Sequence, residues 1–163
     1  GAEIELVELE NRATRLKAAL LRIREQYDFT LIDCPPSLGI ITINALTACD
    51  TVLIPIQCEY YALEGLSQLM ITLRQVKRLY NPRIEIEGVV LTMYDGRLNL
   101  TTQVVEELKR VLPQKIYRTV IPRNVRLSEA PSYGQPVLYY DRGSRGSQAY
   151  EELAEEFLQR NRR

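Results

Sequence analysis

Apolar and polar positions follow two different periods along the chain. From Leu6 to Ile23 the apolar residues recur at spacings of three and four, which is typical of an amphipathic helix. Further along, short apolar runs that predict strands alternate with longer segments of helical period. The predicted strands cover residues 29–33, 51–56, 84–92 and 116–121. The predicted helices cover residues 6–23, 38–49, 61–80, 101–112 and 147–160.

This alternation of strands and helices predicts an α/β fold. Strands that are apolar on both faces indicate a mostly parallel sheet covered by helices on both sides. No linker or repeat divides the sequence, so residues 1–163 are predicted to form a single domain. Ligands of such sheets bind beyond the carboxyl ends of the strands. The loops expected to carry the function are therefore 33–37, 57–62, 93–99 and 122–134.

Composition limits the chemistry. The apolar fraction of 45% and the charged fraction of 26% are those of a globular protein. There is no histidine, which excludes Ser-His-Asp and Cys-His catalysis and His-ligated zinc. The 3 cysteines show no CxxC spacing and no signal peptide is recognisable, which favours a reducing, cytoplasmic setting. No apolar run approaches the roughly 20 residues that cross a bilayer, so a soluble protein without a membrane-spanning segment is expected.

Charge is balanced overall but unevenly distributed. The sequence has 21 basic and 21 acidic residues. Residues 74–126 contain 11 basic and 5 acidic side chains, a net charge of +6 that the remaining segments cancel. Such a basic block is either a solvated helix face or a surface for a polyanion.

One carboxylate follows the first predicted strand. In the segment Leu31-Ile32-Asp33-Cys34-Pro35-Pro36-Ser37, Asp33 stands at the expected carboxyl end of a buried strand. An aspartate there can hold Mg²⁺ directly or through water, as in nucleotide hydrolases. The alternative is an aspartate that caps the following turn or helix.

Four segments together carry a resemblance to a known family. They are residues 27–37, residues 55–65 (PIQCEYYALEG), residues 91–97 (LTMYDGR) and residues 121–132 (IPRNVRLSEAPS). From Tyr27 to about Gln159 the chain resembles the C-terminal part of ParA/Soj-type partitioning ATPases, the deviant Walker family that includes MinD. The resemblance implies a P-loop NTPase-like three-layer sandwich. It also implies binding and slow hydrolysis of ATP with Mg²⁺, coupled to dimerisation, non-specific DNA binding and stimulation by a ParB/Spo0J-type partner, in a cytoplasmic, nucleoid-associated protein.

The sequence departs from this family in one respect. No Gly-Lys-Thr or Gly-Lys-Ser occurs, so the family's phosphate loop, its paired lysines and its catalytic aspartate are not in this chain. We therefore expect an N-terminally truncated ATPase domain that lacks the first strand and helix unit and is inactive alone. The alternative is a non-catalytic ParA-like scaffold. A reading frame upstream that encodes a phosphate loop would distinguish the two.

The resemblance also implies roles for individual residues. Asp33 matches the Walker B aspartate that orders Mg²⁺ and its waters. Adenine-binding positions are matched by Met93, Pro122, Arg123 and Asn124, although Met93 is equally explained as a core residue. Glu59 and Tyr60 lie in a segment near the phosphates and the dimer face, without an assigned role.

Two arginines are singled out for DNA. Arg97 and Arg126 lie in predicted loops after strands and match arginines that bind DNA without sequence preference in ParA/Soj-type dimers. The C-terminal helix separates this chain from its MinD-like relatives, because its polar face is acidic and anionic membranes repel such a face. The expected partners are therefore DNA, a ParB-type protein and a second copy, but no membrane.

Overall fold

The chain divides into two compact units. The structure is a computed structural model that describes residues 2–7, 9–35, 37–59 and 61–162. Unit 1 comprises Gly1–Val52 and Glu64–Ile86. Unit 2 comprises Leu53–Leu63 and Glu87–Arg163. The assignment of residues 1–163 to a single domain stays a prediction.

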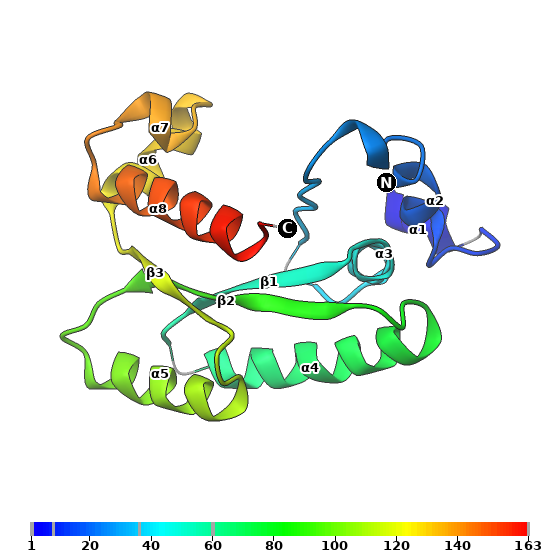
Figure 1. Ribbon diagram of the computed structural model, residues 1–163, viewed down its shortest axis with the longest axis horizontal. Helices are drawn as coiled ribbons and strands as arrows, with labels where there is room; N and C mark the ends of the chain where they lie inside the picture. Colours follow the sequence, from blue (N-terminus) through cyan, green and yellow to red (C-terminus); the bar gives the residue numbers. More distant parts are fainter. Residues whose placement is uncertain (1, 8, 36, 60, 163) are drawn as a thin grey trace. The chain divides into compact units, whose positions relative to one another are not determined.

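A parallel sheet with crossover helices organises the chain (Figure 1). Its described strands are β1 (Thr51–Gln57), β2 (Glu85–Tyr94) and β3 (Ile116–Pro122), in the spatial order β1-β2-β3. Helix α4 (Ala62–Leu79) connects β1 to β2, and α5 (Asn99–Val111) connects β2 to β3. A helical crossover is the connection that consecutive parallel strands require. The predicted α/β fold with a parallel sheet flanked by helices is confirmed.

Burial differs between the central strand and an edge strand. In β2, residues 88–91 are all buried, as expected for a strand covered on both faces. In β1, burial alternates: Ile54 and Ile56 are buried, whereas Leu53 is 37% exposed. The expectation of strands buried on both faces is therefore wrong for β1, because it is an outer strand of the described sheet.

In unit 2, helices α5 and α8 (Arg145–Arg160) lie on opposite sides of the strands (Figure 1). Helix α8 packs on β2 and β3 through a core that contains Val90, Tyr117, Ile121 and Ala149. The helix begins two residues before the predicted start, because the Ser144 side chain accepts a hydrogen bond from the Ser147 backbone N–H at 3.2 Å. A Cβ at Gly146 would lie 2.6 Å from Leu127 Cγ, so glycine allows α8 to approach the preceding segment closely.

Unit 1 has its own apolar core. Leu46 of α3 (Ile40–Ala48) packs with Leu73, Val76 and Ile84. The buried Asn81 side chain, just after α4, donates to the Leu46 and Cys49 carbonyl oxygens at 3.0 and 2.7 Å. The two cysteines of unit 1, Cys34 and Cys49, are free thiols, and burial raises the pKa of Cys49 to about 11.

The single helix predicted over residues 6–23 is wrong. The structure has α1 (Ala2–Val7) and α2 (Arg15–Leu20), with Asn11 at a φ of 57° between them. The buried Asn44 side chain stabilises the break: it donates to the Arg12 carbonyl oxygen at 2.6 Å and accepts from the Leu16 N–H at 3.2 Å. A partner some thirty residues away thus replaces hydrogen bonds that a continuous helix would make internally.

The strand predicted over residues 29–33 does not form. This segment follows η1 (Arg24–Gln26), has no regular secondary structure, and exposes 84% of Leu31. An apolar run becomes a strand only when a neighbour accepts its ladder hydrogen bonds. No such strand pairs with this segment in the part of the chain that the structure describes.

Short helices replace the loop expected after β3. They are α6 (Val125–Glu129), η2 (Ala130–Tyr133) and α7 (Val137–Tyr140). The rings of Tyr133 and Tyr140 stack with centroids 5.1 Å apart. Gly134, at a φ of 63°, ends η2 in the left-handed conformation that glycine adopts without strain.

The register between β2 and β3 is irregular at two points. The paired residues are Val89 with Ile116, Leu91 with Val120, and Tyr94 with Pro122. Extra residues therefore lie in β3 between the first two pairs and in β2 between the last two. Such bulges bend a strand and redirect side chains, often at the rim of a sheet.

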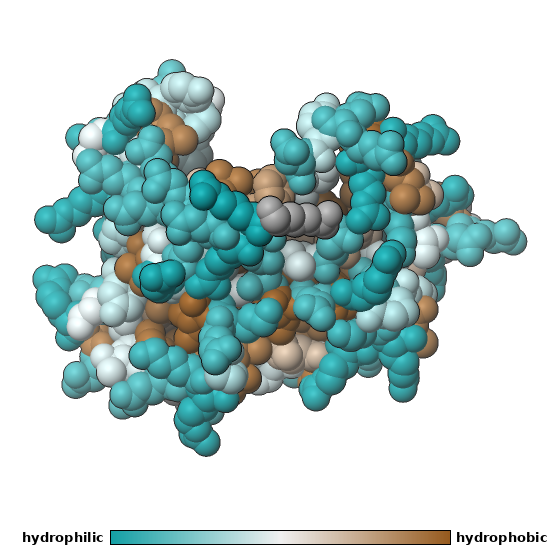
Figure 2. All heavy atoms as spheres, in the orientation of Figure 1, coloured by the Kyte–Doolittle hydropathy of each residue, from teal (hydrophilic) through white to brown (hydrophobic). Residues whose placement is uncertain are grey.

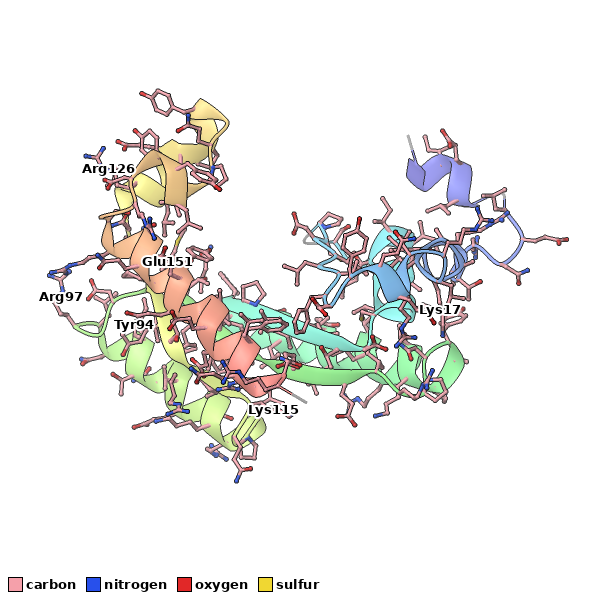
Figure 3. The ribbon with its side chains drawn as sticks, turned by 45° about the horizontal axis from the view of Figure 1, so that its top comes forward. Lys17, Tyr94, Arg97, Lys115, Arg126 and Glu151 are labelled. Atoms are coloured by element: carbon pink, nitrogen blue, oxygen red, sulfur yellow. The ribbon has the colours of Figure 1, made fainter. Side chains whose placement is uncertain are left out.

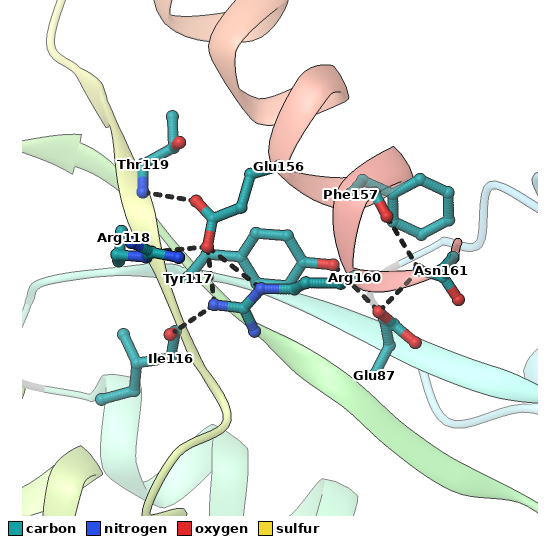
Figure 4. Close-up of polar contacts among 9 residues, drawn as sticks. All are labelled: Glu87, Ile116, Tyr117, Arg118, Thr119, Glu156, Phe157, Arg160 and Asn161. Carbon is teal, nitrogen blue, oxygen red and sulfur yellow. Dashed lines mark hydrogen bonds and ion pairs between the residues drawn. The ribbon is translucent and has the colours of Figure 1, made fainter. Parts of the chain in front are cut away.

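The bulge of β3 is occupied by a carboxylate (Figure 4). Glu156 of α8, 8% exposed, accepts hydrogen bonds from the backbone N–H groups of Arg118 and Thr119 at 2.9 and 2.8 Å. Burial by itself raises the pKa of Glu156, but these donors and Arg160 outweigh it and hold the pKa at about 2. Two backbone N–H groups of the outer strand β3 therefore find their acceptor within the chain instead of remaining unpaired at the edge of the sheet.

Neighbouring side chains complete this arrangement. Arg160 contacts Glu156 at 2.6 Å, donates to the Ile116 carbonyl oxygen at 2.9 Å, and lies 3.8 Å from the centre of the Tyr117 ring. The Tyr117 hydroxyl donates to Glu87 at 3.0 Å. We call this group the edge-strand cluster: Glu87, Tyr117, Glu156, Arg160 and Asn161, which donates to Glu87 at 2.9 Å.

Candidate functional site

Asp33, the predicted magnesium ligand, is an exposed residue of unit 1. Because the strand before it does not form, Asp33 does not stand at a strand end as expected. The described residues contain no group of three or more His, Cys, Asp or Glu side chains able to hold a metal. Mg²⁺ needs no such group, since it commonly binds one or two carboxylates together with water and phosphate. Asp33 fits that limited role.

The predicted adenine positions lie on neighbouring strand ends of unit 2. Met93 is 42% exposed and has a φ of 49°, in the left-handed region that a non-glycine residue rarely adopts. The next residue, Tyr94, pairs in register with Pro122. The bulge in β2 thus places Met93 at the rim beside the loop that starts at Pro122, and its exposure argues against the core alternative.

Arg123 and Asn124 follow directly. Arg123 lies 3.7 Å from Glu59, which comes after β1, so this contact links the loops after two strands. Asn124 begins α6: its Oδ1 accepts from the Arg126 backbone N–H at 2.9 Å. The structure therefore assigns Asn124 a capping role and Glu59 an ion pair. Tyr60 lies outside the described residues.

Arg97 is held by a carboxylate two residues earlier. Its Nε and Nη2 donate to Asp95 Oδ1 and Oδ2 at 2.9 and 2.7 Å, and its backbone N–H donates to Oδ1 at 3.1 Å. These hydrogen bonds hold the pKa of Asp95 at about 2. The Arg97 side chain nevertheless remains 89% exposed.

Arg126 contacts two carboxylates. Its Nη1 lies 2.8 Å from Glu129 Oε2, and its Nε lies 3.1 Å from Asp141 Oδ2. The Tyr140 hydroxyl donates to the same Glu129 oxygen at 3.2 Å. The hydrogen bond from Arg126 lowers the pKa of Glu129. Both arginines singled out for DNA, Arg97 and Arg126, are therefore also members of ion pairs.

We call this group of charged residues the strand-end cluster: Glu59, Asp95, Arg97, Arg123, Arg126, Glu129 and Asp141. Figure 3 shows Arg97 and Arg126 extending outward from different elements of unit 2, the loop after β2 and helix α6. Sequence reasoning found the arginines but missed their carboxylates. The local spacing could have indicated these ion pairs, because Asp95 precedes Arg97 by two residues and Glu129 follows Arg126 by three.

Figure 2 shows hydrophilic side chains over much of the visible face, with apolar residues in smaller patches. Among the helices that the structure describes, none combines the length and apolar character needed to cross a bilayer.

Comparisons with known proteins decide the family. A model of the AAA domain family matches residues 1–86, more than half of the chain. The chain is also 60% identical over 156 residues to the sporulation initiation inhibitor protein Soj of Bacillus subtilis (strain 168). The chain belongs to the ParA/Soj family. The resemblance predicted from the four sequence segments is confirmed.

A second partitioning protein agrees with this ParA/Soj assignment. The chromosome partitioning protein ParA of Myxococcus xanthus (strain DK1622) is 52% identical over 161 residues, 99% of this chain and 57% of that protein. The Soj match covers 96% of this chain and 62% of Soj, so the chain spans less than two thirds of these relatives.

The solved structure also supports the fold. Cobyrinic acid a,c-diamide synthase from Mycobacterium smegmatis, with bound ATP analogue and magnesium, matches with a TM-score of 0.77 at 32% identity. The match covers 98% of this ParA/Soj chain and 58% of the synthase chain. The predicted P-loop NTPase-like fold is confirmed.

Proposed function

We propose that this chain is the part of a partitioning ATPase that follows the phosphate loop. In the complete protein, ATP with Mg²⁺ joins two copies, the dimer binds DNA without sequence preference, and a ParB-type partner stimulates hydrolysis near the nucleoid in the cytoplasm. The observation that carries the proposal is the placement of Met93, Pro122 and Asn124 at adjoining strand ends, on the same unit as Arg97 and Arg126. The names of the Soj and ParA relatives support it.

The nucleotide part of the proposal assigns separate roles to the strand ends and to Asp33. Because the Asn124 oxygen caps α6, its Nδ2 is the group available to donate to a base. Met93 and Pro122 would supply apolar contact with the adenine ring. Asp33 would hold Mg²⁺ through water, and the metal would neutralise phosphate charge. The synthase bound to an ATP analogue and magnesium supports this assignment.

The DNA part rests on exposed guanidinium groups. Arg97 and Arg126 would neutralise backbone phosphates, so binding would weaken steeply with salt, by about 0.9 logarithmic units per contact for each tenfold increase. No recognition helix is expected to read bases.

The proposal is tested by restoring a phosphate loop. A chimaera carries the N-terminal segment of the Bacillus subtilis relative before residues 1–163, and its binding to random-sequence duplex DNA is measured with ATP by fluorescence anisotropy. Arg97→Glu with Arg126→Glu should abolish DNA binding and leave ATP binding unchanged. Lys109→Glu with Lys115→Glu is the matched control, because both lysines are exposed and the charge change is equal. Equal losses in both double variants would contradict the proposal.

Calorimetry tests whether ATP binding requires the N-terminal segment that carries the phosphate loop. The chain of 163 residues should show no micromolar binding of ATP with Mg²⁺, whereas the chimaera should bind both. Micromolar binding by the chain alone would contradict the role given to the phosphate loop. A chimaera that folds but neither binds nor hydrolyses ATP would favour the scaffold alternative.

A further inference from the structure

The strand-end cluster contains more negative than positive groups. Its three guanidinium groups pair with four carboxylates in three separate sets: Arg97 with Asp95, Arg123 with Glu59, and Arg126 with Glu129 and Asp141. A polyanion that approaches these arginines therefore meets carboxylates already in place.

At Arg97 the carboxylate occupies one side of the guanidinium group. Asp95 takes hydrogen bonds from Nε and Nη2, so the Nη1 group remains available on the other side. The Arg97 side chain is 89% exposed but Asp95 only 26%, so the arginine is the outer member of the pair. Phosphate can thus reach Arg97, but with a negative charge directly behind it.

Carboxylates occupy more of the guanidinium group at Arg126 than at Arg97. Glu129 accepts from Nη1 and Asp141 lies against Nε, so both the side and one end of the guanidinium group face carboxylates. The Tyr140 hydroxyl also donates to Glu129 and helps to hold that carboxylate in position. Bidentate binding of a phosphate by Arg126 requires at least one of these contacts to be given up.

Such an exchange is physically accessible. Exposed ion pairs contribute little net stability, because water screens them and the side chains lose entropy. Duplex DNA presents one negative charge per roughly 1.7 Å of its axis and releases counterions when it is neutralised. Phosphate therefore competes well with a single surface carboxylate for the same donors.

We propose that Asp95, Glu129 and Asp141 act as internal competitors for phosphate, so that DNA binding by Arg97 and Arg126 requires exchange of carboxylate for phosphate contacts. This inference rests on the DNA-binding function proposed above. The carboxylates set the affinity low enough for the DNA complex to dissociate. If the carboxylates compete with phosphate, their removal should strengthen DNA binding. If they served only to orient the arginines, their removal should weaken it.

The test uses neutral variants of matched shape in the chimaera with ATP. Asp95→Asn keeps an oxygen for the Arg97 backbone N–H and removes the charge. Glu129→Gln with Asp141→Asn removes the two charges that face the Arg126 guanidinium group and keeps a side-chain oxygen at each position. Each is expected to bind random-sequence duplex DNA about fivefold more tightly at low salt, because a like charge next to the phosphate is gone. The slope of log K against log salt should stay unchanged, since the same arginines contact phosphate.

Two further variants separate competition from other effects. Asp95→Ala removes both the charge and the hydrogen bonds, and it should also bind DNA more tightly than the unaltered protein. Glu107→Gln removes the partner of Arg110 in an exposed pair of α5 and should leave DNA binding within about twofold. Its change in net charge equals that of Asp95→Asn, so it controls for a general effect of charge.

The outcomes are distinct. Weaker binding by Asp95→Ala, or equal gains in Asp95→Asn and Glu107→Gln, overturns the competition proposal. Loss of binding in the Arg97→Glu, Arg126→Glu variant would still support the proposed function in either case. If the unaltered chimaera and all neutral variants fail to bind DNA, the proposed function fails, and the competition proposal falls with it.

Discussion

Unit 2 contains two clusters built from the same kinds of charged side chains in opposite surroundings. In the edge-strand cluster, the Glu156 and Arg160 side chains are 10% and 26% exposed. In the strand-end cluster, Arg97 is 89% exposed and Arg126 50%. The donors also differ: Glu156 accepts from backbone N–H groups of another element, strand β3, whereas the donors described for the Asp95 carboxylate all belong to Arg97, two residues along the chain.

This difference separates a structural role from a functional one. A buried carboxylate without its donors cannot be solvated, so removing one partner of a buried pair is costly. An exposed pair gains water when it opens, so it can change partners at little cost. We infer that the edge-strand cluster stabilises unit 2 and that the strand-end cluster remains available for ligands.

The largest effect is expected from Glu156→Ala. The variant leaves Arg160 and the N–H groups of Arg118 and Thr119 without their acceptor, and it should lower the free energy of unfolding by about 3–4 kcal/mol. Urea denaturation followed by circular dichroism measures the change. Glu155→Ala, an exposed neighbour on the same helix, should change stability by less than about 0.5 kcal/mol. Similar losses in both variants would contradict the structural role.

Acid should weaken the same cluster. The pKa of Glu156 falls from 4.5 to about 2 on folding. A depressed carboxyl pKa stabilises the fold above the unfolded value, and this contribution is lost as the pH falls from about 4.5 towards 2. Between pH 7 and pH 3 the contribution of Glu156 should decrease by about 2 kcal/mol. In Glu156→Gln this part of the pH dependence of the free energy of unfolding should disappear. The same pH dependence in the variant and in the unaltered chain would contradict the role given to Glu156.

The sequence predicted the regular elements of the fold better than its irregular ones. Helices α4, α5 and α8 and strands β2 and β3 have clear periodicity, and each was predicted to within a few residues. The break at Asn11 depends on Asn44, a contact across 32 residues at the Arg12 carbonyl that local spacing does not encode. The segment 29–33 has the pattern of a strand but finds no strand to pair with among the described residues.

At the candidate site, the sequence predicted positions but not contacts. The motif around Met93 and the one around Pro122 both fall at strand ends, because parallel strands end at the same edge of a sheet. The pairing of Arg126 with Asp141 joins residues 15 positions apart through the short helices after β3, which sequence reasoning treated as a loop. The positive φ of Met93 follows from a bulge, and bulge positions depend on the register of the partner strand.

Gly88→Ala tests the apolar support of the edge-strand cluster without removing a charge. A Cβ at Gly88 would lie 2.5 Å from Tyr117 Cε2 and 2.7 Å from the Lys115 carbonyl oxygen, so the ring beneath Arg160 must move. We expect a loss of about 1.5 kcal/mol by urea denaturation. Gly65→Ala, where nothing lies within 4 Å of the added Cβ, should instead raise stability by about 0.5–1 kcal/mol. A stability loss in both variants would indicate a general effect of removing glycine.

The smallest effect is expected at the exposed Asp95–Arg97 pair. A double-mutant cycle of Asp95→Ala and Arg97→Ala separates the interaction of the pair from the loss of either side chain. Because the Arg97 side chain is 89% exposed, opening the pair restores hydration to both groups, and every variant should melt within about 2 °C of the unaltered chain. Thermal denaturation at low and at high salt measures this.

The same cycle applied to Glu156 and Arg160 gives the contrast. Their pair lies against the bulge of β3, so the single variants should each lower the melting temperature clearly, and the double variant by much less than their sum. If the Asp95–Arg97 cycle showed coupling as strong as this one, the strand-end contact would be structural. Exchange of Asp95 for phosphate would then cost stability, and the two clusters would no longer differ in role.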